Sequence, residues 1–159
     1  MQIARGTEHD AAVAAAILRE VSEWLVSQGR KLWDPVEISA EDVARHARAG
    51  ELVIGCEGDD AVACMYLQRS DDLFWPEADA ALYVHRLAVR RAFAGQGRAR
   101  EMLDWAVAEA RRLERPFVRL DTELRSSLLN LYENAGFVRV DAKPIIVGTH
   151  EVVRFERRV

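Results

Sequence analysis

The chain has 159 residues, half of them apolar, and a formal net charge of −4 at pH 7. This length suits one ordinary domain, so we predict a single domain over residues 1–159. The negative charge argues against a nucleic-acid partner. No apolar run reaches the roughly 18 residues of a membrane span, and no apolar leader opens the chain. We therefore expect a soluble cytoplasmic protein with no membrane partner.

The N-terminal half reads as two helices and three strands. Capping patterns at Thr7 and Ser39 begin the helices, and glycines at 29 and 50 end them. The turn-like Gly58-Asp59-Asp60 separates two apolar runs that are typical of a hairpin. In chain order, the predicted elements are a strand over 2–5, helices over 7–29 and 39–50, and strands over 51–56 and 61–68.

The C-terminal half contains one strand-loop-helix-strand crossover. An apolar run is followed by a glycine loop, a helix with one apolar face, and a strand after Pro116. The predicted elements are strands over 82–89, 117–121, 137–140 and 151–155, with helices over 98–113 and 126–134. The order of elements indicates an α+β fold whose strands are mostly antiparallel.

Cysteine and histidine do not form a metal-binding pattern in the sequence. Cys56 and Cys64 flank the hairpin turn, and we expect them to face each other as reduced, buried side chains. The histidines, at positions 9, 46, 85 and 150, are scattered without ligand spacing. We therefore predict no metal.

A basic segment surrounds two glycines that open a helix. Residues 80–100 contain five arginines, at positions 86, 90, 91, 98 and 100, and no acidic residue. Gly95 and Gly97 allow a ligand to approach the backbone, and the free N–H groups of a helix start attract anions. The segment predicts a site for a phosphate-bearing coenzyme, with a solvated basic face as the alternative.

Two known phosphate-binding loops fit this segment poorly. A Walker A loop needs Gly-Lys-Ser/Thr, which is absent. A dinucleotide-binding loop would explain Asp121 at the end of the next strand, but Arg100 occupies the third glycine position. The glycines also come six residues after Val89, when that loop type places them at the strand end.

The segment resembles the GNAT acetyltransferase superfamily. Leu87-Ala88-Val89 followed by Ala94-Gly95-Gln96-Gly97-Arg98-Ala99 is similar to the family's Gln/Arg-x-x-Gly-x-Gly/Ala loop after a strand. About 35 residues later, Leu131-Tyr132-Glu133-Asn134-Ala135-Gly136-Phe137 resembles its Leu-Tyr-Glu-x-x-Gly-Phe segment. Residues 83–89 with 119–121 look like a bacterial subgroup of unassigned substrate.

The resemblance implies a fold and a coenzyme. The fold would be a mixed, mostly antiparallel central sheet with helices on both faces and a splayed central strand pair, 82–89 and 117–121. The coenzyme would be acetyl-CoA. Ala94 replaces the usual Gln or Arg, a contact that Arg91 or Arg98 would supply, and Arg125 replaces an asparagine that touches pantetheine. The implied coenzyme-binding residues are Leu87, Ala88, Val89, Gly95, Gln96, Gly97, Arg98, Ala99 and Arg125.

The resemblance also implies direct attack of an amine on the thioester, which needs a base and an acid. His85 alternates with Leu87 and Val89 along the strand and titrates near neutrality, so it is the candidate base, with an ordered water or a structural role as alternatives. Tyr132 is the candidate acid that protonates the CoA thiolate. Its alternative is a place in the apolar stripe of its helix.

Four residues are candidates for contact with the acceptor. Asp121 and Glu123 would bind the substrate ammonium, and Asp121 fits a turn-stabilising role equally well. Trp33 and Trp75 lie in loops that would border the acceptor, although both also fit as packing residues. The expected partner is an amine-bearing small molecule or peptide, with homodimerisation left open. A non-catalytic acyl-CoA sensor on the same fold is the competing hypothesis.

Overall fold

The computed structural model describes residues 1–30, 33–76, 81–147 and 150–159. The chain forms two compact units. The first unit comprises Met1–Tyr66 and Arg86–Met102, and the second comprises Leu67–His85 and Leu103–Val159. The two units are described separately below, and β3, β4 and α3 each contribute residues to both.

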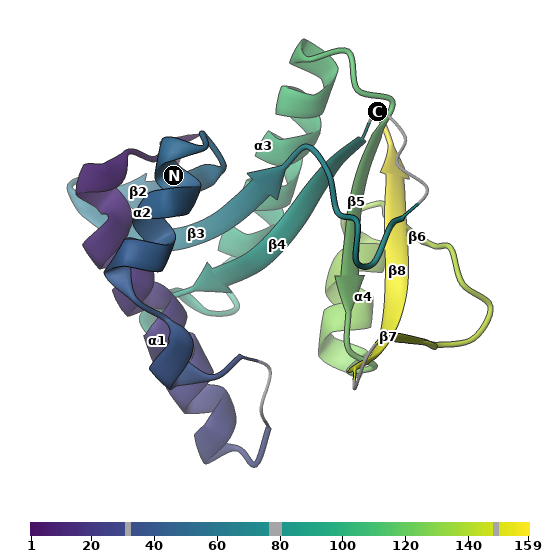
Figure 1. Ribbon diagram of the computed structural model, residues 1–159, viewed down its shortest axis with the longest axis horizontal. Coiled ribbons are helices and arrows are strands. Elements are labelled where there is room, and N and C mark those ends of the chain that lie inside the picture. The colour runs from purple at the N-terminus through teal and green to yellow at the C-terminus, as the bar shows by residue number, and fades with distance from the viewer. Residues whose placement is uncertain (31–32, 77–80, 148–149) are drawn as a thin grey trace. The chain divides into compact units, whose positions relative to one another are not determined.

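The secondary structure follows the predicted order (Figure 1). The α-helices are α1 (Ala11–Ser27), α2 (Ala40–Arg48), α3 (Arg98–Arg112) and α4 (Ser126–Asn134). The strands are β1 (Gln2–Arg5), β2 (Leu52–Glu57), β3 (Asp60–Gln68), β4 (Ala81–Val89), β5 (Phe117–Thr122), β6 (Val138–Arg139), β7 (Ile145–Val147) and β8 (His150–Arg158). Within the described ranges, the short 3-10 helices are η1 (Glu8–Asp10), η2 (Pro35–Glu37) and η3 (Arg91–Phe93).

The sheet is mixed and mostly antiparallel, as predicted. The hydrogen-bonded strand order is β1-β2-β3-β4-β5-β8-β6, and β7 pairs with β8 off this path. β1, β2 and β3 pair antiparallel, as do β5, β6 and β7 with β8. Only the β4–β5 pair is parallel among the pairings that the described residues record. No helix in the described part of the chain has the length and apolarity to cross a bilayer.

The predicted placement of the two cysteines is wrong. In the β2–β3 ladder, Cys64 lies opposite Ile54, and Cys56 lies opposite Ala61. The regular part of the ladder, before the register shift between Gly55 and Cys56, already places Cys64 opposite Ile54, so Cys56 lies two residues nearer the turn. Cys64 is buried and Cys56 half-buried, and both are free thiols.

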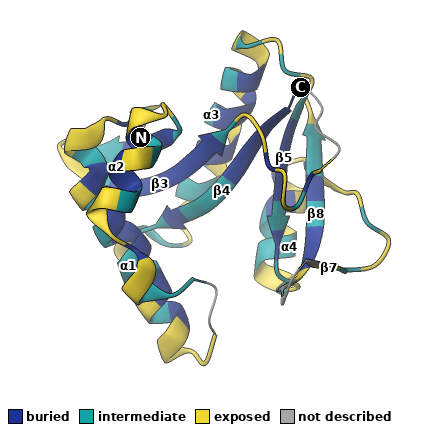
Figure 2. Cartoon of the chain, viewed as in Figure 1, coloured by how far each residue is buried: buried dark blue, intermediate teal, exposed yellow. Residues whose placement is uncertain are grey.

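In the first unit, α1 and α2 cover one face of the strands (Figures 1 and 2). Leu52, Ile54, Cys64 and Tyr66 pack with these helices in one apolar cluster. Such clusters are the main source of stability, because burial removes apolar surface from water. The opposite face of the strands contacts α3, because a Cβ added at Gly55 would lie 3.0 Å from the sulfur of Met102. Helices therefore pack on both faces, as predicted.

In the second unit, β5 and β8 pair along six residues of β5. α4 packs on these strands through Tyr132, whose ring centre lies 5.7 Å from that of Phe155 in β8. β4 pairs with β5 only from Ala81 to Tyr83, opposite Phe117–Arg119, although both strands continue. The pairing therefore ends before His85, which agrees with the predicted splayed strand pair.

Candidate active site

The glycine loop of the first unit has the backbone geometry of an anion site. Gly95 and Gly97 have positive φ angles of 75° and 82°, and a Cβ at either position would meet no atom within 4 Å. The Glu101 N–H donates to the Gly97 carbonyl at 3.1 Å, so helical hydrogen bonding in α3 starts from Gly97. The N–H groups of Arg98 and Ala99 therefore have no acceptor within the helix. These donors lie at the positive end of the helix dipole, which attracts anions.

The Arg98 side chain is already paired. Its guanidinium contacts the Glu57 carboxylate from β2 and, at 2.6 Å, the Glu101 carboxylate one turn further along α3. The hydrogen bond from Arg98 lowers the pKa of the Glu101 carboxyl, so that carboxylate remains charged. The backbone of residue 98, and not its side chain, is therefore the part that faces an incoming anion without a competing partner.

Glu20 of α1 anchors the segment between β4 and the glycine loop. Its carboxylate accepts from Arg90 Nη1 at 2.9 Å and from the Arg91 backbone N–H at 2.7 Å. The Arg91 guanidinium carbon lies 3.6 Å from the centre of the Trp24 ring, a close cation–π contact. Much of the basic charge seen in the sequence is thus matched by carboxylates or aromatic rings of the same unit.

β4 departs from regular strand geometry immediately after His85. Arg86 has φ of 50°, a left-handed conformation that is uncommon for a residue with a Cβ. Its guanidinium carbon lies 5.7 Å from the centre of the half-buried Trp33 ring. Leu87 and Val89 are half-buried, whereas Ala88 packs into the cluster with α1 and α2. The substrate contact predicted for Trp33 stays a prediction.

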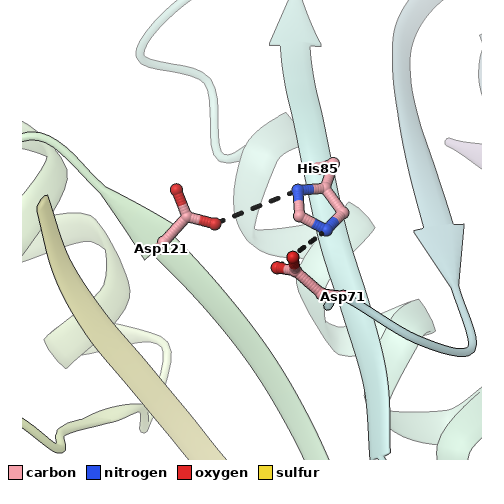
Figure 3. Close-up of side chains that lie close together, drawn as sticks. All are labelled: Asp71, His85 and Asp121. Carbon is pink, nitrogen blue, oxygen red and sulfur yellow. Dashed lines mark ion pairs between the residues drawn. The ribbon is translucent and has the colours of Figure 1, made fainter. Parts of the chain in front are cut away.

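His85 lies between two carboxylates of the second unit (Figure 3). Its Nε2 is 3.3 Å from Asp71 Oδ2, and its Nδ1 is 3.9 Å from Asp121 Oδ1. Asp71 comes from the loop before β4, and Asp121 comes from β5. The arrangement presents an imidazole with one acidic group at each ring nitrogen.

Asp71 is held by a tight turn. Its Oδ1 accepts from the Phe74 N–H at 3.0 Å, and its carbonyl accepts from the Trp75 N–H at 2.9 Å. Burial raises the pKa of the Asp71 carboxyl, but contacts with His85 and with the N–H groups of Phe74 and Leu73 outweigh it and leave that pKa below its ordinary value. Asp71 is therefore a carboxylate at neutral pH.

Asp71, His85 and Asp121 each offer one potential metal-ligand atom, and these atoms lie within 4.8 Å of one another. The two carboxylates approach different ring nitrogens, however, and the lone pairs of those nitrogens point apart. An ion bound to one nitrogen at about 2.0–2.2 Å is thus poorly placed for the carboxylate at the other. The arrangement suits a shared proton better than an ion, and the prediction of no metal stays a prediction.

Tyr132 of α4 is buried among aromatic rings. Burial and the nearby Asp121 carboxylate raise the pKa of Tyr132 to about 12, against opposing effects of a hydrogen bond with Thr122 and of Arg125. The phenol is therefore fully protonated at neutral pH. Its predicted role as proton donor is untested, and its ring also belongs to the apolar packing that the alternative interpretation requires.

Arg125 and Glu123 form an ion pair at the start of α4. Arg125 Nη2 lies 2.8 Å from Glu123 Oε2, and only 15% of the Arg125 side chain is exposed. Its Nε is buried and makes no hydrogen bond within the described residues. Glu123, predicted to bind the substrate ammonium, is thus engaged with an internal cation, and Asp121 is the carboxylate nearer to His85.

Trp75 is enclosed by protein side chains and is only 5% exposed. The guanidinium carbons of Arg119 and Arg154 lie 4.7 Å and 4.8 Å from its ring centre. These two guanidinium groups already make cation–π contacts with the Trp75 ring, which favours its interpretation as a packing residue. Its predicted contact with the acceptor stays untested.

Sequence patterns did not indicate that Asp71 belongs to the site. It sits in the polar segment Arg69-Ser70-Asp71-Asp72, where neither helical nor strand periodicity distinguishes one acid from the other. The available signal was local: an aspartate three residues before a Phe-Trp pair can accept the N–H of the third residue and form a tight turn. That pattern predicts the turn and not the histidine partner.

Comparisons with known proteins agree with the fold. The family model described as an acetyltransferase (GNAT) domain matches residues 48–139. A Bacillus subtilis (strain 168) protein described as the uncharacterized N-acetyltransferase YesJ is 27% identical over 137 residues, which cover 80% of this chain and 76% of that protein.

Two solved structures share the fold. A GNAT-family acetyltransferase of Listeria monocytogenes 4b F2365 superposes with a TM-score of 0.80 at 21% identity, covering 99% of this chain and 94% of that one. The PaiA N-acetyltransferase of Thermoplasma acidophilum, solved in complex with coenzyme A, gives a TM-score of 0.77 at 13% identity, covering 99% and 98%. Because the family model spans more than half of the residues, the chain belongs to the GNAT acetyltransferase family.

Proposed function

We propose that this protein transfers an acetyl group from acetyl-CoA to a primary amine of a small molecule or peptide. Membership of the GNAT family supports acetyl transfer, and the coenzyme A bound to the PaiA relative supports acetyl-CoA as the donor. The class of acceptor is inferred from the position of His85 between the carboxylates of Asp71 and Asp121. Two carboxylates beside a proton acceptor suit a substrate that arrives as an ammonium and must react as an amine.

The coenzyme pyrophosphate binds the backbone of Gly95–Ala99 in this proposal. Positive φ angles at two glycines, open space above them and free N–H groups at the start of α3 support that placement. Main-chain groups of Leu87, Ala88 and Val89 pair with the pantetheine arm as an added strand would. In the second unit, Arg125 stays the proposed replacement for the family's asparagine, and its buried Nε donor supports that role.

The chemical step is direct attack. The amine nitrogen forms a bond to the thioester carbonyl carbon, and the carbon–sulfur bond then breaks. His85 takes the proton that the ammonium loses, and Asp121 holds the ammonium beforehand. Tyr132 gives a proton to the thiolate as negative charge builds on sulfur. Holding both reactants in position contributes much of the rate enhancement.

Release of free CoA thiol tests the proposal. Purified protein is mixed with acetyl-CoA and a panel of polyamines, aminoglycosides, amino acids and peptides, and thiol is measured with a chromogenic disulfide. Thiol release above the amine-free rate with at least one member supports the proposal, and the responding class names the acceptor. Tight acetyl-CoA binding by calorimetry without thiol release from any amine would instead support a non-catalytic sensor.

The base role of His85 has its own test. A His85→Ala variant should lose the acidic limb of the kcat/KM profile or shift it, while acetyl-CoA affinity stays constant. An unchanged limb would assign His85 a structural role, with an ordered water as the base.

A further inference from the structure

Asp71 belongs to no sequence motif of the chain, yet its side chain is buried and held by a turn. Only 6% of it is exposed. Its Oδ1 is used by the Phe74 N–H, whereas Oδ2 is buried and makes no hydrogen bond of ordinary geometry within the described residues. The group nearest to this oxygen among the recorded ion pairs is His85 Nε2, at 3.3 Å. A buried carboxylate oxygen without a donor is costly, and a proton on Nε2 would supply one.

The loop that carries Asp71 is clamped to the sheet. Arg154 of β8 donates from Nη1 to the Phe74 carbonyl at 3.1 Å and lies over the Trp75 ring. Arg119 of β5 lies over the same ring. The residues that follow Asp71 are therefore fixed by two strands, and the position of its carboxylate does not depend on a bound substrate.

The two nitrogens of His85 face different surroundings. Nε2 faces Asp71, at a distance that ring rotation can close to an ordinary hydrogen bond. Nδ1 faces Asp121 Oδ1 across 3.9 Å, too far for a hydrogen bond. A single ammonium with two N–H groups can bridge that separation with ordinary hydrogen-bond lengths. One ring nitrogen thus lies close to a fixed carboxylate, and the other lies farther from its neighbouring carboxylate.

We propose that Asp71 is a positioning residue that holds the Nε2–H tautomer of His85, which leaves Nδ1 as the atom that takes the proton from the amine. Neutral imidazole carries one proton, and the hydrogen bond at one nitrogen decides which lone pair is free. The amine proton moves to Nδ1 while the amine lone pair becomes free to attack, giving an imidazolium flanked by Asp71 and Asp121. The catalytic consequence of this inference rests on the proposed function. The tautomer itself is inferred from geometry alone.

Nitrogen NMR of His85 tests the tautomer directly. Protein labelled with ¹⁵N is recorded at a pH where the imidazole is neutral, and long-range proton–nitrogen correlations distinguish the two nitrogens. The wild type should show Nε2 protonated. In Asp71→Asn the side-chain oxygen can still accept from Phe74, but the amide now donates to Nε2, so the proton should move to Nδ1. A wild-type ring protonated on Nδ1, or a variant with the wild-type tautomer, would overturn the proposal.

Kinetics with the same variant test the consequence. Asp71→Asn should lower kcat/KM roughly 10²-fold or more, as expected for a misplaced proton acceptor, with acetyl-CoA affinity unchanged. The acidic limb of the pH profile should move to lower pH, because the imidazolium loses one neighbouring carboxylate. Among the residues that the structure describes, the ion pairs of the ring are those with Asp71 and Asp121, so Asp121 remains as the second influence.

Asp72→Asn is the matched control, because it removes an exposed carboxylate from the same turn. It should leave the tautomer, the rate and the pH profile at wild-type values. Equal losses in both variants would mean that the turn, and not the contact with His85, matters, and would overturn the proposal. If His85→Ala keeps its acidic limb while the tautomer result holds, the base role of the proposed function fails and the Asp71–His85 pairing stands.

Discussion

Arg154 binds both carboxylate oxygens of Asp141, with Nη2 at 2.7 Å from Oδ1 and Nε at 3.0 Å from Oδ2. This two-point contact joins the segment after β6 to β8, and the same guanidinium reaches the Phe74 carbonyl. The loop that carries Asp71 and the segment that carries Asp141 therefore share one anchoring side chain.

Replacing Asp141 with asparagine should destabilise the protein in a pH-dependent way. The hydrogen bond from Arg154 lowers the pKa of the Asp141 carboxyl below its unfolded value. The contribution of the Asp141 carboxylate to the free energy of unfolding is therefore fully present above the ordinary aspartate pKa of about 3.9. It is lost as the pH falls through the pKa of the folded state. We expect a loss of about 1.5–3 kcal/mol at pH 7 that shrinks below pH 4, measured by urea unfolding.

The control for this series is Asp59→Asn, in the exposed turn between β2 and β3. Its unfolding free energy should track that of the wild type at each pH. A constant difference between wild type and Asp141→Asn across the whole range would mean that the ion pair does not carry the effect.

Gly97→Ala should weaken coenzyme binding as well as stability. A Cβ at φ of 82° costs about 1–2 kcal/mol, and it would also stand in the open space above the loop. Gly58→Ala is the matched control, because Gly58 has φ of 59° and equally open surroundings in the β2–β3 turn. Calorimetry with acetyl-CoA should show reduced affinity for Gly97→Ala and near-complete loss for Gly97→Glu. Full affinity in a folded Gly97→Glu variant would contradict the placement of the pyrophosphate.

Tyr132→Phe should lower kcat roughly 10²-fold while KM for acetyl-CoA stays nearly constant. The change keeps the ring that packs on Phe155 and removes only the hydroxyl. Burial raises the pKa of this phenol to about 12, so its protonated form persists over the whole working pH range and should add no basic limb to the wild-type profile. Steady-state kinetics would decide the matter, and normal turnover in the variant would mean that water or the acceptor supplies the proton.

Glu114→Gly should stabilise the protein by about 0.5–1 kcal/mol. Glu114 follows α3 in a left-handed conformation with φ of 54°, while Arg115 closes the helix by donating to the Ala110 carbonyl at 2.8 Å. Glycine adopts this conformation without a Cβ penalty. Glu114→Ala removes the same exposed charge and keeps the Cβ, so it should not show the gain. Equal unfolding midpoints for the two variants in urea would rule out backbone strain at this position.

Local signals in the sequence predicted most of the fold. The Ser39 hydroxyl accepts from the Asp42 N–H as the capping pattern requires, and positive-φ glycines at 29 and 50 follow α1 and α2. The strand β7 was missed because its three residues lie beyond Pro144, in a run too short to show alternation. Signals that depend on neighbouring residues were thus sufficient for the longer elements.

The site was less predictable, because its decisive contacts join residues far apart in the sequence. His85 lies on a predicted strand, but nothing local pairs it with Asp71. Similarly, the sequence predicted that Arg98 binds a phosphate, but in the folded chain its guanidinium pairs with Glu57 of β2. The predicted β2–β3 hairpin contained that glutamate, but a pattern of apolar residues does not specify which polar side chains meet across two elements.

The pairing of Arg98 with Glu57 and Glu101 also bears on ionic strength. Salt weakens attraction between exposed full charges most strongly, because mobile ions gather around them. Carboxylates already neutralise the Arg98 side chain. We therefore expect peptide N–H groups, which carry no net charge, to bind the phosphate. Coenzyme affinity in this protein should consequently change little between low salt and the roughly 0.15 M of a cell, so the enzyme would keep its donor substrate as the surrounding electrolyte varies.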